Sequence, residues 1–311
     1  MKPIRIGIML WSLPGDDWAD KVKRIEELGY SSLLIPDHPN LQWDSVATQT
    51  AIAVVTEKLN VGSYVFNIDF HHPVMLAKAS ATIQNITRGR HEFGIGAGWS
   101  KVEYEQAGLL FDKPGIRISR LGEAIQIIQS MWVNERTNFE GAHFKISNQP
   151  QAASDMNWGQ PKTLMGGGGK KSLSLAGRYA DIISIIPQGV NFTEHLTPKR
   201  LKEKISWVQS AAEKIGRDLE EIEYNFTYFP GMAITDDPEP TLKQIAKDYG
   251  LTVEEVKQNP NFFVGNLSEF REDIEERYKT TGINYYAIPG FLSNFEEIEE
   301  IGSIIKKLGN L

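Results

Sequence analysis

The 311-residue chain contains no cysteine, and this absence excludes a set of chemistries at once. Without cysteine there are no disulfides, no thiol nucleophiles and no thiolate metal ligands. Long apolar runs are also missing: none reaches the roughly 20 residues that a membrane-spanning helix needs. The first residues lead straight into a strand-like segment, without the pattern of a signal peptide. We therefore expect a cytoplasmic protein that makes no membrane contact.

An excess of positive charge is missing as well. Lys and Arg number 33 against 40 Asp and Glu, which gives a formal net charge of −7. Extended nucleic-acid binding needs Lys and Arg clustered on one face, so we expect no nucleic-acid partner. An anionic small molecule remains a possible ligand if the cations that bind it are local.

The chain does show a regular alternation of strand-like and helix-like segments. Such alternation is typical of parallel strands joined by crossover helices, and eight repeats in about 300 residues favour a single-domain (β/α)₈ TIM barrel. Three segments predict insertions in this barrel: a long loop at 100–116, a hairpin turning at Glu140-Gly141 within 133–160, and a mostly polar excursion at 230–265 with a short helix. The expected strands lie near 4–11, 32–36, 61–66, 90–99, 161–165, 181–186, 222–229 and 283–288, and the expected helices near 18–28, 45–58, 73–88, 118–132, 172–179, 199–215, 270–278 and 295–308.

The fourth expected strand, residues 90–99, is unusually rich in glycine. Gly94, Gly96 and Gly98 remove side chains at alternate positions, and Trp99 follows. Glycine inside a strand marks a bulge or a close approach by a ligand or another backbone. Two interpretations therefore stay open. Either a flat ligand lies over the strand end, or the strand lacks side chains at these positions so that it fits a crowded barrel interior.

In such a barrel the active site lies at the carboxyl ends of the strands. Several signatures are missing from these ends. No His-x-His pair follows the first strand, which argues against a binuclear metal site; no lysine ends a strand, which argues against a Schiff base; and no carboxylate pair indicates a glycosidase. We therefore expect no metal site. The expected strand ends instead carry aromatic residues and glycines.

Gly166 to Gly169 directly precede an expected helix. Consecutive backbone N–H groups at a helix N-terminus suit a phosphate, and Lys170 or Lys171 could add charge. The plainer interpretation is a flexible turn, but four glycines exceed what a turn requires. Barrels more usually bind phosphate after strands seven and eight, whereas this turn follows the fifth strand.

His38 follows the second strand, next to Asp37. A histidine at a strand end can exchange protons near neutral pH. Taken alone, it is more simply a histidine that hydrogen-bonds its own loop, and Asp37 either orients it or caps the turn. A flat, phosphorylated ligand among aromatic residues, with neither a metal nor a covalent nucleophile, indicates a redox cofactor.

Several segments resemble the bacterial luciferase-like flavin oxidoreductases, and within them the deazaflavin-dependent branch. The resemblance extends from residue 4 to about 186 and is vague beyond 190. The matching segments are Ile35–His38, Val61–Asn67, Asp69–Pro73, Gly89–Trp99, Glu103–Gly108, Phe111, Arg117, Arg120-Leu121, Leu164–Gly169, Leu175-Ala176 and Ala180-Asp181.

The resemblance implies a homodimeric barrel that binds FMN or the deazaflavin coenzyme F-420 at its C-terminal mouth. The cofactor phosphate would lie on the glycine turn, and the ring on a bulge after the third strand, where some members have a cis peptide that would fall at Tyr64–Val65. His38 would face the reactive side of the ring as the catalytic residue. The implied cofactor-binding residues are Asp37, Tyr64, Val65, Asn67, Gly98, Gly166, Gly167, Gly168 and Lys170.

The chain departs from the deazaflavin sugar-phosphate dehydrogenases at one position. Those enzymes have a catalytic glutamate where this chain has Trp99, so their substrate chemistry does not transfer. We expect Trp99 and Trp11 to line a substrate pocket instead. Arg117, Arg120 and Glu123 also match the family, and we interpret them as structural pairs.

The sequence therefore predicts an oxidoreductase that transfers a hydride between a reduced flavin or deazaflavin and a small organic substrate. With FMN and oxygen it would be a monooxygenase, supplied by a separate flavin reductase. Two alternatives stay open: a catalytically silent flavin-binding barrel, and a phosphate-binding lyase or isomerase, which would need a paired acid and base.

Overall fold

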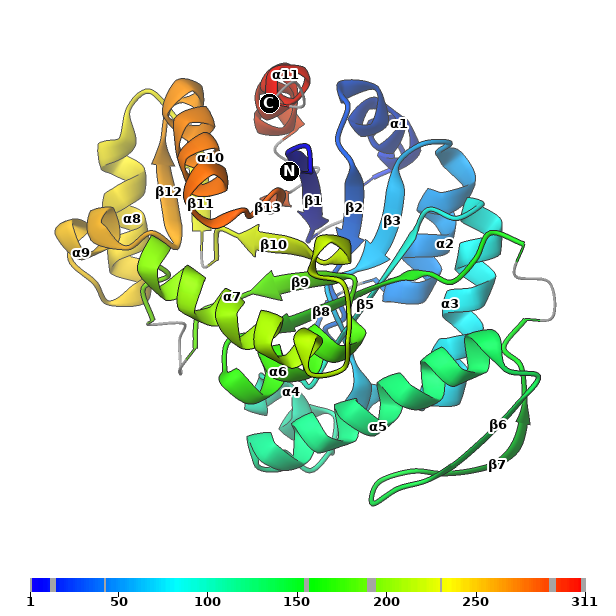
Figure 1. The fold of residues 1–311 in the computed structure, drawn as a ribbon. Coiled ribbons are helices and arrows are strands. Elements are labelled where there is room, and N and C mark those ends of the chain that lie inside the picture. Colours follow the sequence, from blue (N-terminus) through cyan, green and yellow to red (C-terminus); the bar gives the residue numbers. More distant parts are fainter. Residues whose placement is uncertain are drawn as a thin grey trace.

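A computed structural model describes residues 2–11, 15–41, 43–153, 157–188, 194–229, 231–290 and 295–308. It contains a closed barrel of parallel strands surrounded by helices, which confirms the predicted (β/α)₈ fold (Figure 1). The strands run in the order β3-β2-β1-β13-β10-β9-β8-β5-β4, and pairing of β3 with β5 closes the barrel. The short β4 continues β3, so the two together count as one of the eight strands of the barrel.

The barrel strands and the helices around them follow the predicted segments closely. The strands are β1 (Arg5–Leu10), β2 (Ser32–Ile35), β3 (Asn60–Ser63), β4 (Phe66–Asn67), β5 (His91–Gly96), β8 (Lys162–Gly167), β9 (Ile182–Ile185), β10 (Glu223–Thr227) and β13 (Tyr285–Gly290). The surrounding helices are α1 (Trp18–Leu28), α2 (Ser45–Val55), α3 (Pro73–Thr87), α5 (Pro114–Val133), α6 (Lys170–Tyr179), α7 (Pro198–Glu213), α10 (Leu267–Thr281) and α11 (Phe295–Leu308). Short 3₁₀ turns, η1 (Ile68–Phe70) and η3 (Leu219–Glu221), complete the connections.

The predicted long loop at 100–116 is wrong. Residues Lys101–Gln106 form the helix α4, and α5 already begins at Pro114, where proline suits a first helical turn. Six residues are too few for helical periodicity to show in the sequence, which explains the error. The hairpin at Glu140-Gly141 is confirmed: β6 (Arg136–Glu140) and β7 (Lys145–Pro150) pair antiparallel beside α5 (Figure 1).

The excursion at 230–265 holds more regular structure than the sequence indicates. Two helices, α8 (Pro238–Tyr249) and α9 (Val253–Gln258), replace the single predicted one, because Gly250 turns the chain with φ +66°. They lie beside a parallel pair of strands, β11 (Gly231–Ile234) and β12 (Phe262–Gly265). Strands of four residues so far apart in the sequence leave no readable pattern.

The glycines of β5 leave room for the backbone of the neighbouring wall. A Cβ on Gly94 would lie 1.9 Å from the Ser63 carbonyl oxygen, and one on Gly96 would lie 2.7 Å from Val65 Cγ2. The crowded-interior interpretation therefore accounts for these two positions. Gly98 differs, because it has φ +69° and lies beyond the strand.

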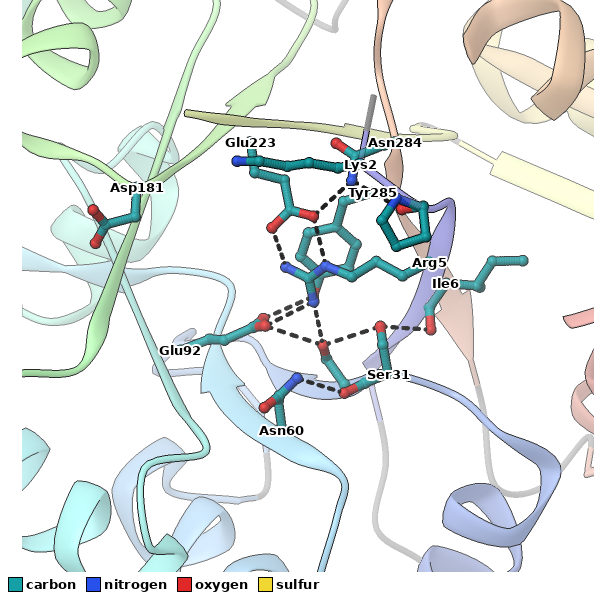
Figure 2. A network of polar contacts seen from close by, with 12 residues as sticks. Lys2, Arg5, Ile6, Ser31, Asn60, Glu92, Asp181, Glu223, Asn284 and Tyr285 are labelled. Atoms are coloured by element: carbon teal, nitrogen blue, oxygen red, sulfur yellow. Dashed lines mark hydrogen bonds and ion pairs between the residues drawn. The ribbon is translucent and has the colours of Figure 1, made fainter. Parts of the chain in front are cut away.

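A network of charged side chains fills the N-terminal end of the barrel (Figure 2). Arg5 at the start of β1 forms ion pairs of 2.7 Å with Glu92 and 2.6 Å with Glu223, and it stacks 3.4 Å above the ring of Tyr285. Tyr285 donates a 2.9 Å hydrogen bond to Glu92, and Asn284 donates one of 2.8 Å to Glu223. Burial alone would raise the pKa of Glu223, but Arg5 outweighs it and holds that pKa below its usual range.

None of the described helices is both long and apolar enough to cross a membrane.

Candidate active site

The opposite end of the barrel is hollow. A cavity of about 270 Å³ opens where the strands end, as expected for this fold. Every residue predicted for the site lines it except Lys170. Its walls comprise Met9, Trp11, Asp37, His38, Tyr64, Val65, Asn67, Gly96, Ala97, Gly98, Trp99, Glu103, Pro114, Arg117, Ile118, Gly166, Gly167, Gly168, Ser172, Ser184, Ile186, Thr227 and Phe229.

His38 is held by a carboxylate that the sequence did not indicate. Its Nδ1 lies 2.9 and 3.0 Å from the two carboxylate oxygens of Glu103, a buried residue of α4. A carboxylate accepts, so Nδ1 carries the proton, and Nε2 of the neutral ring is left as an acceptor. Glu103 lay inside the matched family segment, but the predicted loop gave no reason to expect its side chain in the cavity.

Asp37 does not orient His38. Its Oδ2 instead accepts 2.9 Å hydrogen bonds from the backbone N–H of Asn67 and from Nε2 of His71. Asp37 therefore fixes the chain that leaves β4, and the cap proposed for the turn before Pro39 is not among the contacts found for this carboxylate. His72, the residue after His71, caps α3 because its Nδ1 accepts a hydrogen bond from the backbone N–H of Val74 at 3.3 Å.

Two tryptophans surround His38. Trp11 stacks on it with ring centroids 5.7 Å apart and planes 14° apart, and Trp99 meets it edge-on at 6.1 Å and 83°. Trp99 is 57% exposed, so more than half of its surface is accessible to solvent at the mouth. These three rings give the cavity one aromatic wall.

The peptide between Tyr64 and Val65 is cis, as the resemblance implied. The Tyr64 hydroxyl points into the barrel, where it contacts Ser184 Oγ and donates to Asn225 Oδ1 at 2.7 Å. Thr227, two residues beyond Asn225 in β10, is buried, and its Oγ1 has no hydrogen-bond partner among the described residues. A buried hydroxyl without a partner is costly, and because Thr227 lines the cavity its hydroxyl is available to a ligand there.

Asn67 and Gly98 meet on one side of the cavity. Asn67 Oδ1 lies 3.1 Å from the hydroxyl of Tyr104, whose other neighbour is Asp69 at 2.7 Å. A Cβ on Gly98 would lie 2.1 Å from that hydroxyl. Glycine is therefore required at 98 both by its positive φ and by the close approach of Tyr104.

The glycine turn forms the other side. A Cβ on Gly166 would meet nothing closer than Ser184 at 3.9 Å, so protein packing does not require glycine there and its absent side chain keeps the cavity open. Gly167 and Gly168 are crowded, by Ser172 Oγ and by the Pro187 carbonyl respectively. Gly169 is the N-cap of α6 and offers no side chain to cap it, which leaves the first amides of the helix available to an anion.

Lys170 is the one predicted site residue that the cavity lacks. It is exposed, and it lies with Ser174 and Arg178 on an outer groove bordered by α7. Positions four apart share one helix face, and this face is turned away from the cavity. A buried lysine of α7, Lys204, contacts the glycine turn from behind instead, with Nζ 2.6 Å from the Gly168 carbonyl oxygen.

The arginines near the mouth are structural. Arg117 donates to the carbonyl oxygens of Ala97, Gly98 and Asp112 at 3.1, 3.4 and 2.5 Å. Arg120 pairs with Asp69 at 2.7 Å and with Asp112, which confirms the predicted structural pairing. Glu123 instead accepts from the backbone N–H groups of residues 142–144 at the tip of the β6–β7 hairpin.

Comparison with known proteins gives one family and one fold. The family model described as luciferase-like monooxygenase matches residues 12–283. Among curated proteins, the chain is similar to the pyrimidine monooxygenase RutA of Stutzerimonas stutzeri (strain A1501), with 28% identity over 181 residues, 57% of this chain and 47% of that protein. RutA of Escherichia coli (strain SMS-3-5 / SECEC) is 27% identical over 186 residues, 57% and 48% of the two chains. The chain thus spans about half the length of these relatives.

Two solved structures share the fold across nearly the whole chain. An F-420-dependent secondary alcohol dehydrogenase, in complex with an F-420–acetone adduct, has a TM-score of 0.81 at 19% identity, covering 99% of both chains. The coenzyme F-420-dependent tetrahydromethanopterin reductase of Methanopyrus kandleri has a TM-score of 0.80 at 20% identity, again over 99% of both. At such identities the likeness concerns the fold.

Proposed function

Because the chain belongs to the luciferase-like monooxygenase family, we propose that it is an oxidoreductase that binds FMN or coenzyme F-420 in the mouth cavity. It transfers a hydride between this cofactor and a small organic substrate or, with FMN and oxygen, an oxygen atom. One observation carries the proposal: a glycine turn at a helix N-terminus and a histidine–carboxylate pair line the same cavity.

The residues present fit such a cofactor. The uncapped amides of α6 suit its phosphate, and the open space at Gly166 leaves room for the chain between phosphate and ring. Ser172 lines the same part of the cavity, and its hydroxyl, which donates to the Gly169 carbonyl at 2.9 Å, would turn its hydrogen toward the phosphate on binding. The unpartnered hydroxyl of Thr227 and the apolar side chain of Val65 suit a ring with polar edges and flat faces. Asp37 and Asn67 also line the cavity, where the hydrogen bond between them fixes the chain that leaves β4 beside the ring.

When bound, a reduced flavin or deazaflavin supplies the hydride, and only the flavin readily activates oxygen. His38 supplies the proton that accompanies hydride transfer to a carbonyl, or removes one in the reverse direction, through Nε2. Glu103 holds the ring so that Nε2 faces the cavity and stabilises the protonated imidazole. Trp11 and Trp99 exclude water from one side of the histidine and stack on a planar substrate.

The charges of the cavity favour an uncharged substrate. Its charged side chains are Asp37, His38, Glu103 and Arg117. The two carboxylates pair with His71 and His38, and the Arg117 guanidinium donates to three backbone carbonyls. The segments outside the described residues that follow β1, β9, β10 and β13 add no charged side chain, since 12–14, 189–193, 230 and 291–294 contain none. Among these residues a substrate carboxylate would find only Arg117, which is already engaged with backbone carbonyls, and it would meet the like charges of Asp37 and Glu103, so turnover of a methyl ester should exceed that of the matching acid. A preference for the acid would contradict this.

The direct test is equilibrium titration of the purified protein with FMN and with F-420, followed by absorbance and fluorescence. We expect saturable binding of one of them, and loss of the absorbance of the bound oxidised cofactor when a substrate is oxidised. If neither cofactor binds, the proposal is contradicted. If one binds but no compound in a broad substrate panel is turned over, the alternative of a catalytically silent flavin-binding barrel is favoured. If FMN is used, we expect dependence on a separate flavin reductase, and sedimentation should reveal a homodimer.

A further inference from the structure

A buried lysine that does not line the cavity supports the glycine turn. Lys204 lies on α7, and its side chain has no exposed surface. Its Nζ donates hydrogen bonds of 2.6 Å to the Gly168 carbonyl, 3.1 Å to the Ile186 carbonyl and 2.5 Å to Glu194 Oε2. All three donors of the ammonium group are thus engaged, and two of them connect the ends of β8 and β9.

The lysine is one part of a nearly neutral cluster. Glu194 also accepts from Arg200, which pairs in turn with Glu203 at 2.6 Å, and, at 2.7 Å, from the backbone N–H of Gln188. Burial lowers the pKa of Lys204, and the Glu194 carboxylate opposes that shift. Because the charges of Lys204 and Glu194 cancel at a distance, Lys204 is not a long-range attractor of anions. Its influence has to pass through the groups that it touches.

Of the two backbone carbonyls that Lys204 contacts, the closer belongs to the peptide joining Gly168 and Gly169. In a trans peptide the N–H points away from the C=O, so the Gly169 amide is directed to the side opposite Lys204. A hydrogen bond from an ammonium to the carbonyl polarises the peptide and strengthens its N–H as a donor. Gly169 is the uncapped N-cap of α6, and its amide has no acceptor among the described residues.

We propose that Lys204 is a positioning residue for the cofactor phosphate: it fixes and polarises the Gly168–Gly169 peptide so that its amide and those of the first turn of α6 meet the anion. This inference rests on the proposed function, because it needs a phosphorylated cofactor in the mouth cavity. It assigns to a residue buried behind the turn the role that the sequence suggested for the exposed Lys170. Lys204 itself does not touch the cofactor.

The test compares each cofactor with its phosphate-free form, FMN with riboflavin or F-420 with its phosphate-free deazaflavin, whichever pair the wild type binds. Lys204→Met should raise the Kd of the phosphorylated cofactor about tenfold or more, since it removes a charge-assisted hydrogen bond. The Kd of the phosphate-free form should change less than about threefold, because the ring contacts other residues. Lys202→Met, an exposed lysine on the same helix, is the matched control and should change neither.

The outcomes separate this inference from the proposed function. If the wild type binds the phosphorylated form no more tightly than the phosphate-free form, the phosphate site of the proposed function is wrong. If the wild type binds the phosphorylated form more tightly than the phosphate-free form and Lys204→Met keeps the same ratio of the two Kd values, the role of Lys204 is overturned. If both Kd values rise together, Lys204 only holds the fold, and the inference is overturned as well.

A second variant covers the case in which Lys204→Met does not fold. Glu194→Gln keeps an acceptor for Lys204 and keeps its bond to Gly168, but removes the negative charge that compensates it. The preference for the phosphorylated form should then be preserved or increased. If the ratio of the Kd of the phosphate-free form to that of the phosphorylated form instead falls toward one, the inference is overturned.

Discussion

The two ends of this barrel both contain buried charged groups, but they arrange them in opposite ways. At the N-terminal end, Arg5 lies between Glu92 and Glu223, and Tyr285 and Asn284 occupy further carboxylate lone pairs (Figure 2). At the C-terminal end, the His38–Glu103 pair borders a cavity. The same strands thus end in a filled network on one side and in a hollow on the other.

The difference lies in which polar groups remain unsatisfied. In the network around Arg5 the charges pair with each other. Around the cavity, the hydroxyl of Thr227 and the first amides of α6 lack partners among the described residues. Unsatisfied buried groups cost stability unless a ligand pairs with them. We infer that the N-terminal end serves stability and the C-terminal end serves binding, and four variants test this division.

The largest effect should come from His38→Ala at the mouth. Loss of the proton-transfer group should lower kcat about 10²- to 10⁴-fold. Cofactor affinity and the free energy of unfolding should barely change, because the phosphate is bound elsewhere in the cavity. Steady-state kinetics, a cofactor titration and urea unfolding measure the three quantities, with His195→Ala, on an exposed loop, as control. Unchanged turnover would make His38 structural.

At the other end, Arg5→Met should destabilise the fold without affecting the chemistry. It leaves two buried carboxylates without their cation, which costs about 3–5 kcal/mol of unfolding free energy. Where the variant is folded, its kcat should be near that of the wild type. Arg24→Met removes an exposed arginine that also has two glutamate partners, and it should cost little. Equal losses in both variants would contradict the special role of the network.

The same variant has a defined pH dependence. In the wild type the folded-state pKa of Glu223 is lowered, so its contribution to stability is present above the unfolded value of about 4.3 and is lost as the pH falls through the folded value. Without Arg5 the main lowering cause is gone, and burial, which raises that pKa, is opposed only by the weaker effects of Asn284 and Lys162. The stability difference between wild type and Arg5→Met should therefore shrink as the pH falls from 7 toward 4. Urea unfolding at several pH values measures it, and a constant difference would exclude Glu223 as its source.

A smaller effect is expected from Glu103→Gln. The amide still accepts from Nδ1 of His38 but no longer stabilises a charged imidazole, so kcat should fall about 10- to 100-fold. The Kd of the cofactor and the free energy of unfolding should barely change, whereas a purely structural role would change them together with kcat. Glu105→Gln, on the exposed side of α4, is the matched control. A loss of cofactor affinity equal to the loss of kcat would argue against a positioning role.

The smallest effect should come from reversing Lys170 and Lys171 to glutamate together. Both side chains are exposed on an outer groove, where water and salt screen their charges. The Kd of the phosphorylated cofactor should rise less than about threefold. A rise of tenfold or more would show that Lys170 and Lys171 interact with the phosphate, and it would contradict the role inferred for Lys204.

Sequence patterns predicted most of the fold because strand and helix periodicities are local. The helix at 295–308 and the hairpin turn at Glu140-Gly141 appeared as predicted. Partners far apart in the sequence could not be predicted: Arg5 and Glu223 meet across 218 positions. Within the site, residues at strand ends were found, since the barrel brings those ends together. Glu103 was missed because its six-residue helix was predicted as a loop. Lys204 was missed because helical periodicity indicates a buried face but not that its ammonium contacts the glycine turn.

The central claim is that a planar, phosphorylated redox cofactor occupies the C-terminal mouth. The most direct measurement is a crystal structure of the protein with the cofactor that the titration selects. The account predicts density for the phosphate at the N-terminus of α6, beside Gly168 and Ser172, with the ring against Val65 and His38. Density for the cofactor outside this cavity, or a phosphate bound away from the glycine turn, would contradict it.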